Sequence, residues 1–537
     1  MPSLGLPIYG QPRAPDLERP RWRSLEEQAR GPGEPVREFG EGADRAPEGL
    51  GRRSFLQILG ASAALAGLEG CKPPRQKVVS YVRPPGAVTP SVPSAYATAA
   101  SHLGRAVGLV VTSWEGRPTK VEGNREHPGS RGGTDVLLQA SILDLYDPAR
   151  LRGFDLAGRA AGRPALLAEL SRLAHSHAAD GGARLRFLVE PTSSPTLEAL
   201  RTRILERFPR ARFDAWAAVD DDAERAGAAI AFGRPLASVI SVERADVILS
   251  LESDFLWLEG EPLRQAREFG ARREPGRLNR LYVAEAGQTI TGGMADHRFR
   301  MRSAEVLGFG RAVAAALAAR HGLAQLAPLG APAAAEQARA AQAVAADLFR
   351  ARGRSLVLAG ARQPAAVHAL AAALNEALGN VGETITWRPP ALLDPEAGPG
   401  RLAALARELD AGRVDTLVVT AWNPLHTAPA DLELRRAFAR APRTIALALR
   451  GDETVRAAAW KLARSHPLEC WGDLRARDGS VSIVQPLVAP LHESLTEVEL
   501  LAAFLDDAGR GDWRIVREGW QARAGEAGFD RRWEEWL

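Results

Sequence analysis

The sequence predicts an α/β fold in which two doubly wound, largely parallel sheets follow a small β-hairpin domain. Residues 185–190 are expected to form a short strand, and residues 245–253 and 280–286 are apolar runs of the kind found in buried parallel strands. Between such runs lie segments with helical composition, for example the Ala- and Leu-rich residues 304–320. Strands that alternate with helices of about 10–15 residues favour an open parallel sheet with helices on both faces.

The later part of the chain continues this alternation. Helices are expected over residues 365–378 and, as one or two helices, over 321–350. The further expected strands are residues 355–362, 415–424, 444–450 and 480–487. In such sheets ligands bind at loops that follow the carboxyl ends of the strands. The loops in that position are residues 190–195, 253–261, 286–293, 360–364, 379–382 and 422–428, none of which is a G-x-G-x-x-G motif or a P-loop.

An antiparallel hairpin is expected before the α/β part. The β-formers Leu109 and Val111 lead into a turn over residues 114–118, and residues 119–122 form the return strand. A helix over residues 141–151 follows. The length of 537 residues allows about three or four domains. The expected segments are a polar leader (1–50), an export signal (51–71), a Pro-rich linker (72–98), the hairpin domain (99–155), a first α/β domain (156–345), a second α/β domain (346–510) and a Trp-rich C-terminal docking helix (511–537).

Composition excludes several classes of protein. The chain has only two cysteines, Cys71 and Cys470, which excludes a disulfide scaffold, a four-thiolate iron–sulfur cluster and an all-cysteine zinc site. Its histidines form no H-x-x-H or H-E-x-x-H pattern. The net charge is +4, and the arginines are interspersed with acidic residues rather than gathered in a basic stripe, so nucleic acid is not an expected partner.

The segment around residue 52 has the pattern of a twin-arginine export signal. Arg52 and Arg53 are followed by Phe55 and Leu56, and then by a mildly apolar stretch over residues 58–68. The alternative is a buried core helix. The stretch ends at Cys71, where lipidation would anchor the chain to a membrane surface. The alternative for Cys71 is an unmodified residue of an uncleaved signal.

Several segments resemble, in the same order, those of one enzyme superfamily. They are residues 116–134 (GRPTKVEGNREHPGSRGGT), 139–151, 291–302 (TGGMADHRFRMR), 360–382, 421–432 (AWNPLHTAPADL) and 452–491. The chain resembles the molybdopterin oxidoreductase superfamily, and more closely the Tat-variant-translocated large subunit of alternative complex III, a quinol:electron-acceptor oxidoreductase. The resemblance runs from about residue 20 to the end and implies a truncated form of that fold, without its C-terminal barrel and iron–sulfur portion.

Departures from the superfamily pattern concern its cofactors. The resemblance places Asp135 where the fourth cysteine ligand of a [4Fe–4S] cluster belongs, and Leu137 where an electron-relaying lysine belongs. The molybdenum ligand would come from a loop matching residues 190–194, in which a serine could serve. The alternative is that these residues cap the next helix. Cys470 has no neighbouring ligand in the sequence and is expected to be a small buried apolar residue. No iron–sulfur cluster is therefore expected, and no molybdopterin.

The last 25 residues are rich in tryptophan. Trp513, Val516 and Trp520 fall on one helical face, and Phe529, Trp533 and Trp536 on another. We interpret Trp513, Trp520, Trp533 and Trp536 as a surface for docking a partner protein, because tryptophan anchors are typical of interface centres. The alternative is that these rings pack against the chain's own α/β layer.

These observations lead to one main functional hypothesis. The chain is expected to be a non-catalytic, cofactor-free structural subunit of a membrane-associated quinol-oxidising respiratory complex. Its expected location is the periplasmic side of the cytoplasmic membrane, and its expected partners are an iron–sulfur subunit, a c-type haem subunit and integral membrane quinol-binding subunits. No catalytic, cofactor-binding or metal-binding residue is assigned. The alternatives are a molybdopterin-dependent oxidoreductase that uses a partner's clusters, and an exported assembly factor for redox subunits.

Overall fold

The computed structural model describes residues 92–332, 334–392 and 399–537. The expected export signal with Arg52, Arg53, Phe55 and Leu56 lies outside the described residues, as do Cys71 and most of the Pro-rich linker. Among the residues described, no helix is both long and apolar enough to cross a membrane.

The described chain begins with an antiparallel sheet in the order β1 (Ser94–His102), β2 (Arg105–Trp114), β3 (Arg117–Gly123). The turn between β2 and β3 has positive φ at both Glu115 and Gly116, as a two-residue hairpin turn requires. Helix α3 (Val136–Tyr146) packs along β3. The expected hairpin is therefore present, with one additional strand, β1, that spans the expected boundary between linker and hairpin domain.

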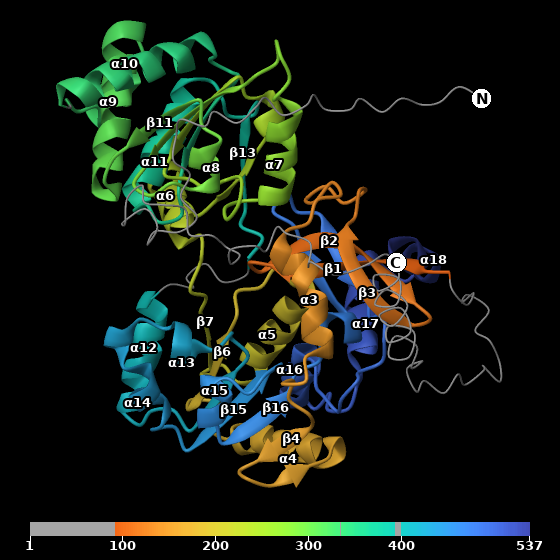
Figure 1. The fold of residues 1–537 in the computed structure, drawn as a ribbon. Helices are drawn as coiled ribbons and strands as arrows, with labels where there is room; N and C mark the ends of the chain where they lie inside the picture. Colours follow the sequence, from red (N-terminus) through yellow and green to blue (C-terminus); the bar gives the residue numbers. More distant parts are fainter. Residues whose placement is uncertain (1–91, 333, 393–398) are drawn as a thin grey trace, which may run out of the picture. The chain divides into compact units, whose positions relative to one another are not determined.

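A seven-stranded sheet forms the first α/β unit, in the order β5-β4-β16-β15-β14-β6-β7 (Figure 1). Its strands from β16 to β7 are parallel, whereas β4 and β5 pair antiparallel at one edge. The bounds are β4 (Phe154–Leu156), β5 (Ala160–Ala161), β6 (Leu185–Val189), β7 (Arg212–Ala215), β14 (Thr416–Val419), β15 (Arg443–Ala448) and β16 (Trp460–Ala463).

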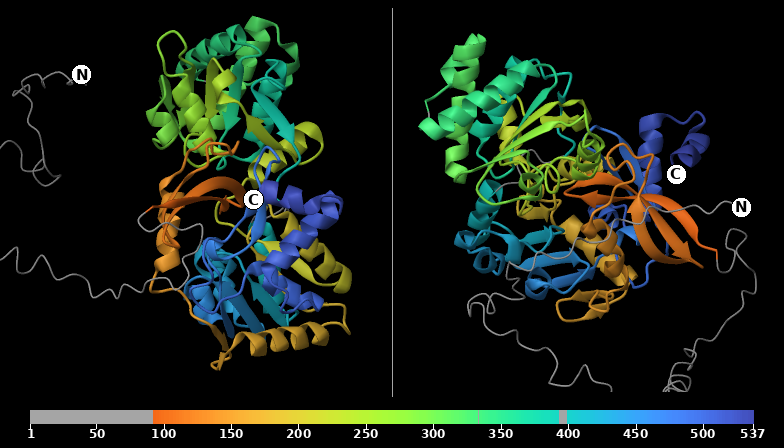
Figure 2. Two further views of the ribbon diagram at one scale, coloured as in Figure 1. Left: turned by 90° about the vertical axis from the view of Figure 1, so that its right-hand side faces the viewer. Right: turned by 45° about the horizontal axis from the view of Figure 1, so that its top comes forward.

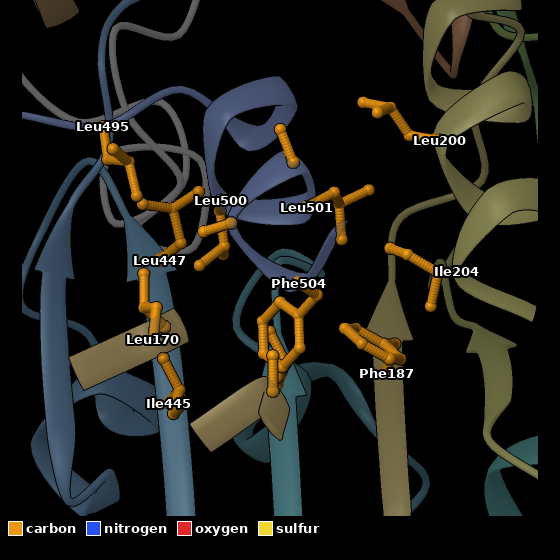
Figure 3. Packing of buried hydrophobic residues seen from close by; sticks show 14 of the residues in the cluster. Leu170, Phe187, Leu200, Ile204, Ile445, Leu447, Leu495, Leu500, Leu501 and Phe504 are labelled. Atoms are coloured by element: carbon orange, nitrogen blue, oxygen red, sulfur yellow. The ribbon is translucent and has the colours of Figure 1, made fainter. Parts of the chain in front are cut away.

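Both faces of this sheet are buried, which explains why β6 and β14 are apolar runs without alternation. One face packs against α4 (Arg163–Ser176), α5 (Pro195–Arg207) and α16 (Glu497–Ala502). The other packs against α12 (Pro399–Asp410), α14 (Leu434–Phe438) and α15 (Glu453–Ala457). In Figure 3 the side chains of the first face converge between sheet and helices: Leu170, Phe187, Leu200, Ile204, Ile445, Leu447, Leu495, Leu500, Leu501 and Phe504.

A four-stranded parallel sheet forms the second unit, in the order β11-β10-β9-β12. Helices α9 (Ser303–His321), α10 (Ala335–Arg350) and α11 (Ala365–Ala377) pack on one face (Figures 1 and 2). The pair β8 (Ala237–Ile240) and β13 (Ile385–Arg388) and helix α7 (Pro262–Ala271) pack on the other. Helix α6 (Asp222–Phe232) lies against α11. The sheet consists of β9 (Val247–Leu251), β10 (Arg280–Glu285), β11 (His297–Arg300) and β12 (Ser355–Ala359).

The sheets do not follow the expected division of the α/β part at residue 345. The seven-stranded sheet takes strands from residues 154–215 and again from 416–463, and the four-stranded sheet is inserted between these two stretches. The expected strand 480–487 is also different, because β18 (Val481–Val484) pairs antiparallel with β17 (Gly472–Arg475). The apolar pattern of a segment shows that it is buried but does not specify its neighbour, so pairing across long connections escaped prediction.

Two helices, α17 (Asp512–Ala524) and α18 (Phe529–Trp536), end the chain beside the β17–β18 hairpin (Figure 2). Trp533 is only 4% exposed and packs with Val516 and Phe529 in a small core, with Trp520 partly buried against it. Trp513 and Trp536 are 43% and 42% exposed. The expectation of four docking tryptophans therefore needs correction: Trp533 belongs to the chain's own core, because two short helices bury one ring between them.

Candidate functional site

A cavity of about 490 Å³ lies at the carboxyl ends of strands from both α/β units. Four of the six loops expected to bind ligands contribute to its wall, namely 190–195, 253–261, 286–293 and 360–364, whereas 379–382 and 422–428 do not. The turn between β1 and β2 closes one side. Gly104 has φ +78° there, and a Cβ atom would lie 2.6 Å from the Pro191 carbonyl oxygen, so only glycine fits.

One wall of the cavity is a buried cluster of charged side chains at the start of α6. Asp221 accepts from Arg105 and lies 2.9 Å from Arg225. Glu224 pairs with Arg477 and accepts from the Ser238 amide at 2.9 Å and hydroxyl at 2.6 Å. We call this group the α6 cluster, and its members are Arg105, Asp221, Asp222, Glu224, Arg225, Ser238 and Arg477.

Opposite charges dominate the electrostatics of the α6 cluster. Burial alone would raise the pKa of Glu224, but the charge and hydrogen bonds of Arg477 outweigh it and lower that pKa to about 2. Burial lowers the pKa of Arg105, and the charge of Asp221 opposes this effect. Glu224 is therefore a carboxylate at any physiological pH, and its charge is neutralised by an arginine rather than by solvent.

The same wall carries polar atoms that the folded chain does not satisfy. Arg225 Nε and Trp387 Nε1 are buried and have no hydrogen-bond partner among the described residues. Trp387 pairs with Ser238 across β13 and β8, which places both side chains on the same face. An unpaired buried polar atom costs about 1–3 kcal/mol, so these two donors lower the stability of the fold.

Other titratable groups line the cavity with shifted pKa values. Burial raises the pKa of Glu190, Asp220 and Glu259 and lowers that of His368. Glu259 is nevertheless held in place, because it accepts from Ser253 Oγ at 2.6 Å and from the Ala361 amide at 3.0 Å. Buried titratable groups with shifted pKa values in a cavity are typical of sites that carry out acid–base chemistry.

Asp135 does not face this cavity. Its carboxylate accepts from the Leu138 amide at 2.8 Å and so caps the N-terminus of α3. It also lies 3.6 Å from His102 Nδ1. Leu137 is 61% exposed on the first turn of the helix. The residue at the position that the resemblance assigns to a cluster ligand thus has a structural role.

Ser193 and Ser194 are also committed to the fold. Ser193 Oγ lies 2.7 Å from the Gly104 carbonyl oxygen and 2.9 Å from that of Arg475. Ser194 accepts from the Leu197 amide at 3.1 Å as the N-cap of α5 and donates to Asp473 at 2.5 Å. Neither serine lines the cavity. The helix-capping alternative for residues 190–194 agrees with this geometry.

Cys470 and the acidic and histidine residues form no metal centre in the part of the chain that the structure describes. No group of three or more His, Cys, Asp and Glu side chains there is arranged to hold a metal ion. Burial raises the pKa of the Cys470 thiol to about 12, and its Sγ lies 3.8 Å from the Pro467 carbonyl oxygen. This shift favours the protonated thiol, although the residue as a whole is only half-buried.

The α6 cluster was not predicted from the sequence. Arg105, Asp221 and Arg477 come from three distant parts of the chain and meet only in the fold. The one local signal was the acidic run Asp220 to Asp222 directly before an Ala-rich helix. Trp387 gave no signal at all, because its unpaired indole nitrogen depends on the packing around it.

The antiparallel N-terminal sheet, the two parallel-sheet units and the cavity at their strand ends define a molybdopterin oxidoreductase-like fold. Acetylene hydratase from Pelobacter acetylenicus has a solved structure that matches with a TM-score of 0.60 and 12% sequence identity, over 76% of this chain and 69% of that one. At this identity the likeness concerns the fold alone. No protein-family model matches the sequence, and no curated protein does.

The buried part of the cavity wall does not fit the phosphate-bearing molybdenum–pterin cofactor that the resemblance implies. In the loop expected to supply the metal ligand, the two serine hydroxyls of Ser193 and Ser194 both donate within the protein. Of the buried cavity arginines, Arg105, Arg225 and Arg477 are each paired with a carboxylate. Guanidinium groups that bind phosphate must instead be available to it.

Proposed function

We propose that this chain is a cofactor-free structural subunit of a membrane-associated, quinol-oxidising respiratory complex of the alternative complex III type. The observation that supports this most directly is that Asp135 and Ser194, at positions where the resemblance would place cofactor ligands, act as helix N-caps. Such a chain would bind and position the other subunits and would not itself carry electrons. Its partners would be an iron–sulfur subunit, a c-type haem subunit and integral membrane subunits that bind quinol.

In this proposal the chain is exported by the twin-arginine route and acts on the periplasmic side of the cytoplasmic membrane. A lipid on Cys71 would anchor the chain to the membrane in addition to its contacts with the partner subunits. The docking surface would centre on Trp513 and Trp536, which α17 and α18 leave exposed. Exposed aromatic rings at the end of a chain suit the centre of a protein interface.

Metal analysis and co-purification test the proposal together. The full chain is tagged in its host, extracted from membranes with mild detergent, and analysed for molybdenum, tungsten and iron. We expect iron only in co-purified partner subunits, and no stoichiometric molybdenum or tungsten. Trp513→Ala should reduce recovery of the iron–sulfur subunit, whereas Trp422→Ala, which removes a 65% exposed ring elsewhere, should not. A chain that purifies alone with bound molybdenum would refute the proposal.

A second candidate function is a molybdopterin-dependent oxidoreductase subunit that uses clusters on a partner. The cavity with its buried carboxyl groups, including Glu190 and Glu259, favours it. The discriminating measurement is the pterin content of the purified chain, read from the fluorescence of an oxidised, denatured extract. One pterin or more per chain selects this function over the first.

A further inference from the structure

Helix α6 begins where an anion would be expected to bind. Its N-terminus lines the cavity close to the carboxyl ends of parallel strands, and free backbone amides at such a terminus attract phosphate groups. Here the chain itself supplies the negative charge. Asp220 to Asp222 precede the helix or begin it, and Glu224 lies in its first turn. The Asp222 amide already donates to Asp220 Oδ1 at 2.9 Å.

Three buried arginines surround the same point. Arg105 comes from β2, Arg225 from α6 and Arg477 from the β17–β18 turn, and each is less than 10% exposed. Three guanidinium groups gathered in a buried wall form a strong site for phosphate or carboxylate. A buried charge requires a partner, and the partners here are Asp221 for Arg105, Asp221 and Asp222 for Arg225, and Glu224 for Arg477.

The cavity as a whole carries an excess of acidic groups. Its wall contains six carboxyl side chains against four guanidinium groups. The acidic residues are Glu190, Asp220, Asp221, Glu224, Asp254 and Glu259, and the basic ones are Arg105, Arg225, Arg362 and Arg477. An entering phosphate would therefore meet like charges directly beside the arginines, and juxtaposed like charges are strongly unfavourable.

We infer that Asp221 and Glu224 occupy an anion-binding site built from Arg105, Arg225 and Arg477, and so keep the cavity closed to phosphate-bearing ligands. The two carboxylates take the place of the ligand's phosphate oxygens. Arg225 Nε and Trp387 Nε1 are further donors beside this site that lack partners in the described structure. This role of the cavity wall does not depend on which partner subunits the chain binds.

The test uses the full chain with inorganic pyrophosphate as the probe. Glu224→Gln and Asp221→Asn each remove one carboxylate charge and keep a similar shape. Melting temperature and titration calorimetry are measured with pyrophosphate and with chloride at equal ionic strength. We expect no specific shift for the wild type. Each variant should melt lower in chloride, recover in pyrophosphate, and bind it at least about tenfold more tightly than the wild type, because a like charge has gone. Adding Arg477→Ala to Glu224→Gln should abolish that binding.

Glu469→Gln is the matched control. Glu469 is also fully buried against an arginine, Arg150, but it does not line the cavity. This variant should lose stability without recovering in pyrophosphate. If a cluster variant does not fold in chloride, refolding with pyrophosphate should restore it. The inference is overturned if the wild type binds pyrophosphate as tightly as the variants do, if neither variant gains binding or recovery, or if Glu469→Gln recovers equally.

Discussion

Two buried arginine–carboxylate groups in this chain differ in what surrounds them. Arg150 and Glu469 form a two-point pair at 3.0 and 2.6 Å, and Glu469 also accepts from the His466 and Leu491 amides at 2.8 and 2.9 Å. In the α6 cluster, by contrast, the paired side chains Asp221, Glu224 and Arg477 border a cavity. The first group joins parts of the fold, whereas the second occupies space that a ligand could use.

The largest expected effect comes from breaking the enclosed pair. Glu469→Gln leaves the Arg150 charge buried and unpaired, which should lower the free energy of unfolding by about 3–5 kcal/mol. Glu224→Gln should lower it less, because water can enter the cavity and solvate Arg477. Urea denaturation of both variants measures the difference. An equal or larger loss for Glu224→Gln would remove the distinction between the two groups.

The second-largest effect on stability is expected from acid, which protonates Glu224 in the α6 cluster. The pKa of Glu224 is about 2 in the folded chain against a normal 4.5, so its stabilising contribution is complete above about pH 4.5 and is lost as the pH falls towards 2. Urea midpoints between about pH 5 and about pH 3 should therefore fall more steeply for the wild type than for Glu224→Gln. Parallel pH profiles would show that Glu224 does not carry this dependence.

A smaller loss is expected at the position that resembles a metal-ligand loop. Ser194→Ala removes the cap of α5 and leaves Asp473 without one donor, at a cost of about 1–2 kcal/mol. Ser194→Asn keeps a capping oxygen and should recover part of this loss. The readout is again the urea midpoint, with metal content measured alongside. A stable Ser194→Ala variant that loses bound molybdenum would make Ser194 a ligand rather than a cap.

The smallest effect is expected from an indole nitrogen on the cavity wall. Trp387→Phe removes a donor that has no partner in the described structure, whereas Trp216→Phe removes one that donates to Thr427 at 2.9 Å. Trp387→Phe should therefore cost about 1 kcal/mol less than Trp216→Phe, which is the value of one hydrogen bond. If the two losses are the same, Trp387 Nε1 has a partner in solution.

The fold class was predictable because its evidence is local. Strands β9, β10 and β12 are apolar runs, a composition that predicts buried strands. The fold class that they predict is confirmed. Pairing was not predictable, since β18 has strand composition whether it joins a parallel sheet or a hairpin. The site was not predictable either, because Arg105, Asp221 and Arg477 are far apart in the sequence and come into contact only in the folded chain. Only the acidic residues at 220–222 indicated locally that the start of α6 was unusual.

The insertion of one sheet within the strands of another has a consequence for synthesis. Arg184, just before β6, bonds to Asp415, just before β14, across 231 residues. At about 5–20 residues per second a ribosome needs roughly 10–50 s to supply the second strand after the first. During that interval β6 has one edge without its neighbour, and an uncovered apolar strand invites aggregation. A chaperone that binds extended apolar segments would shield this edge of β6 until β14 emerges.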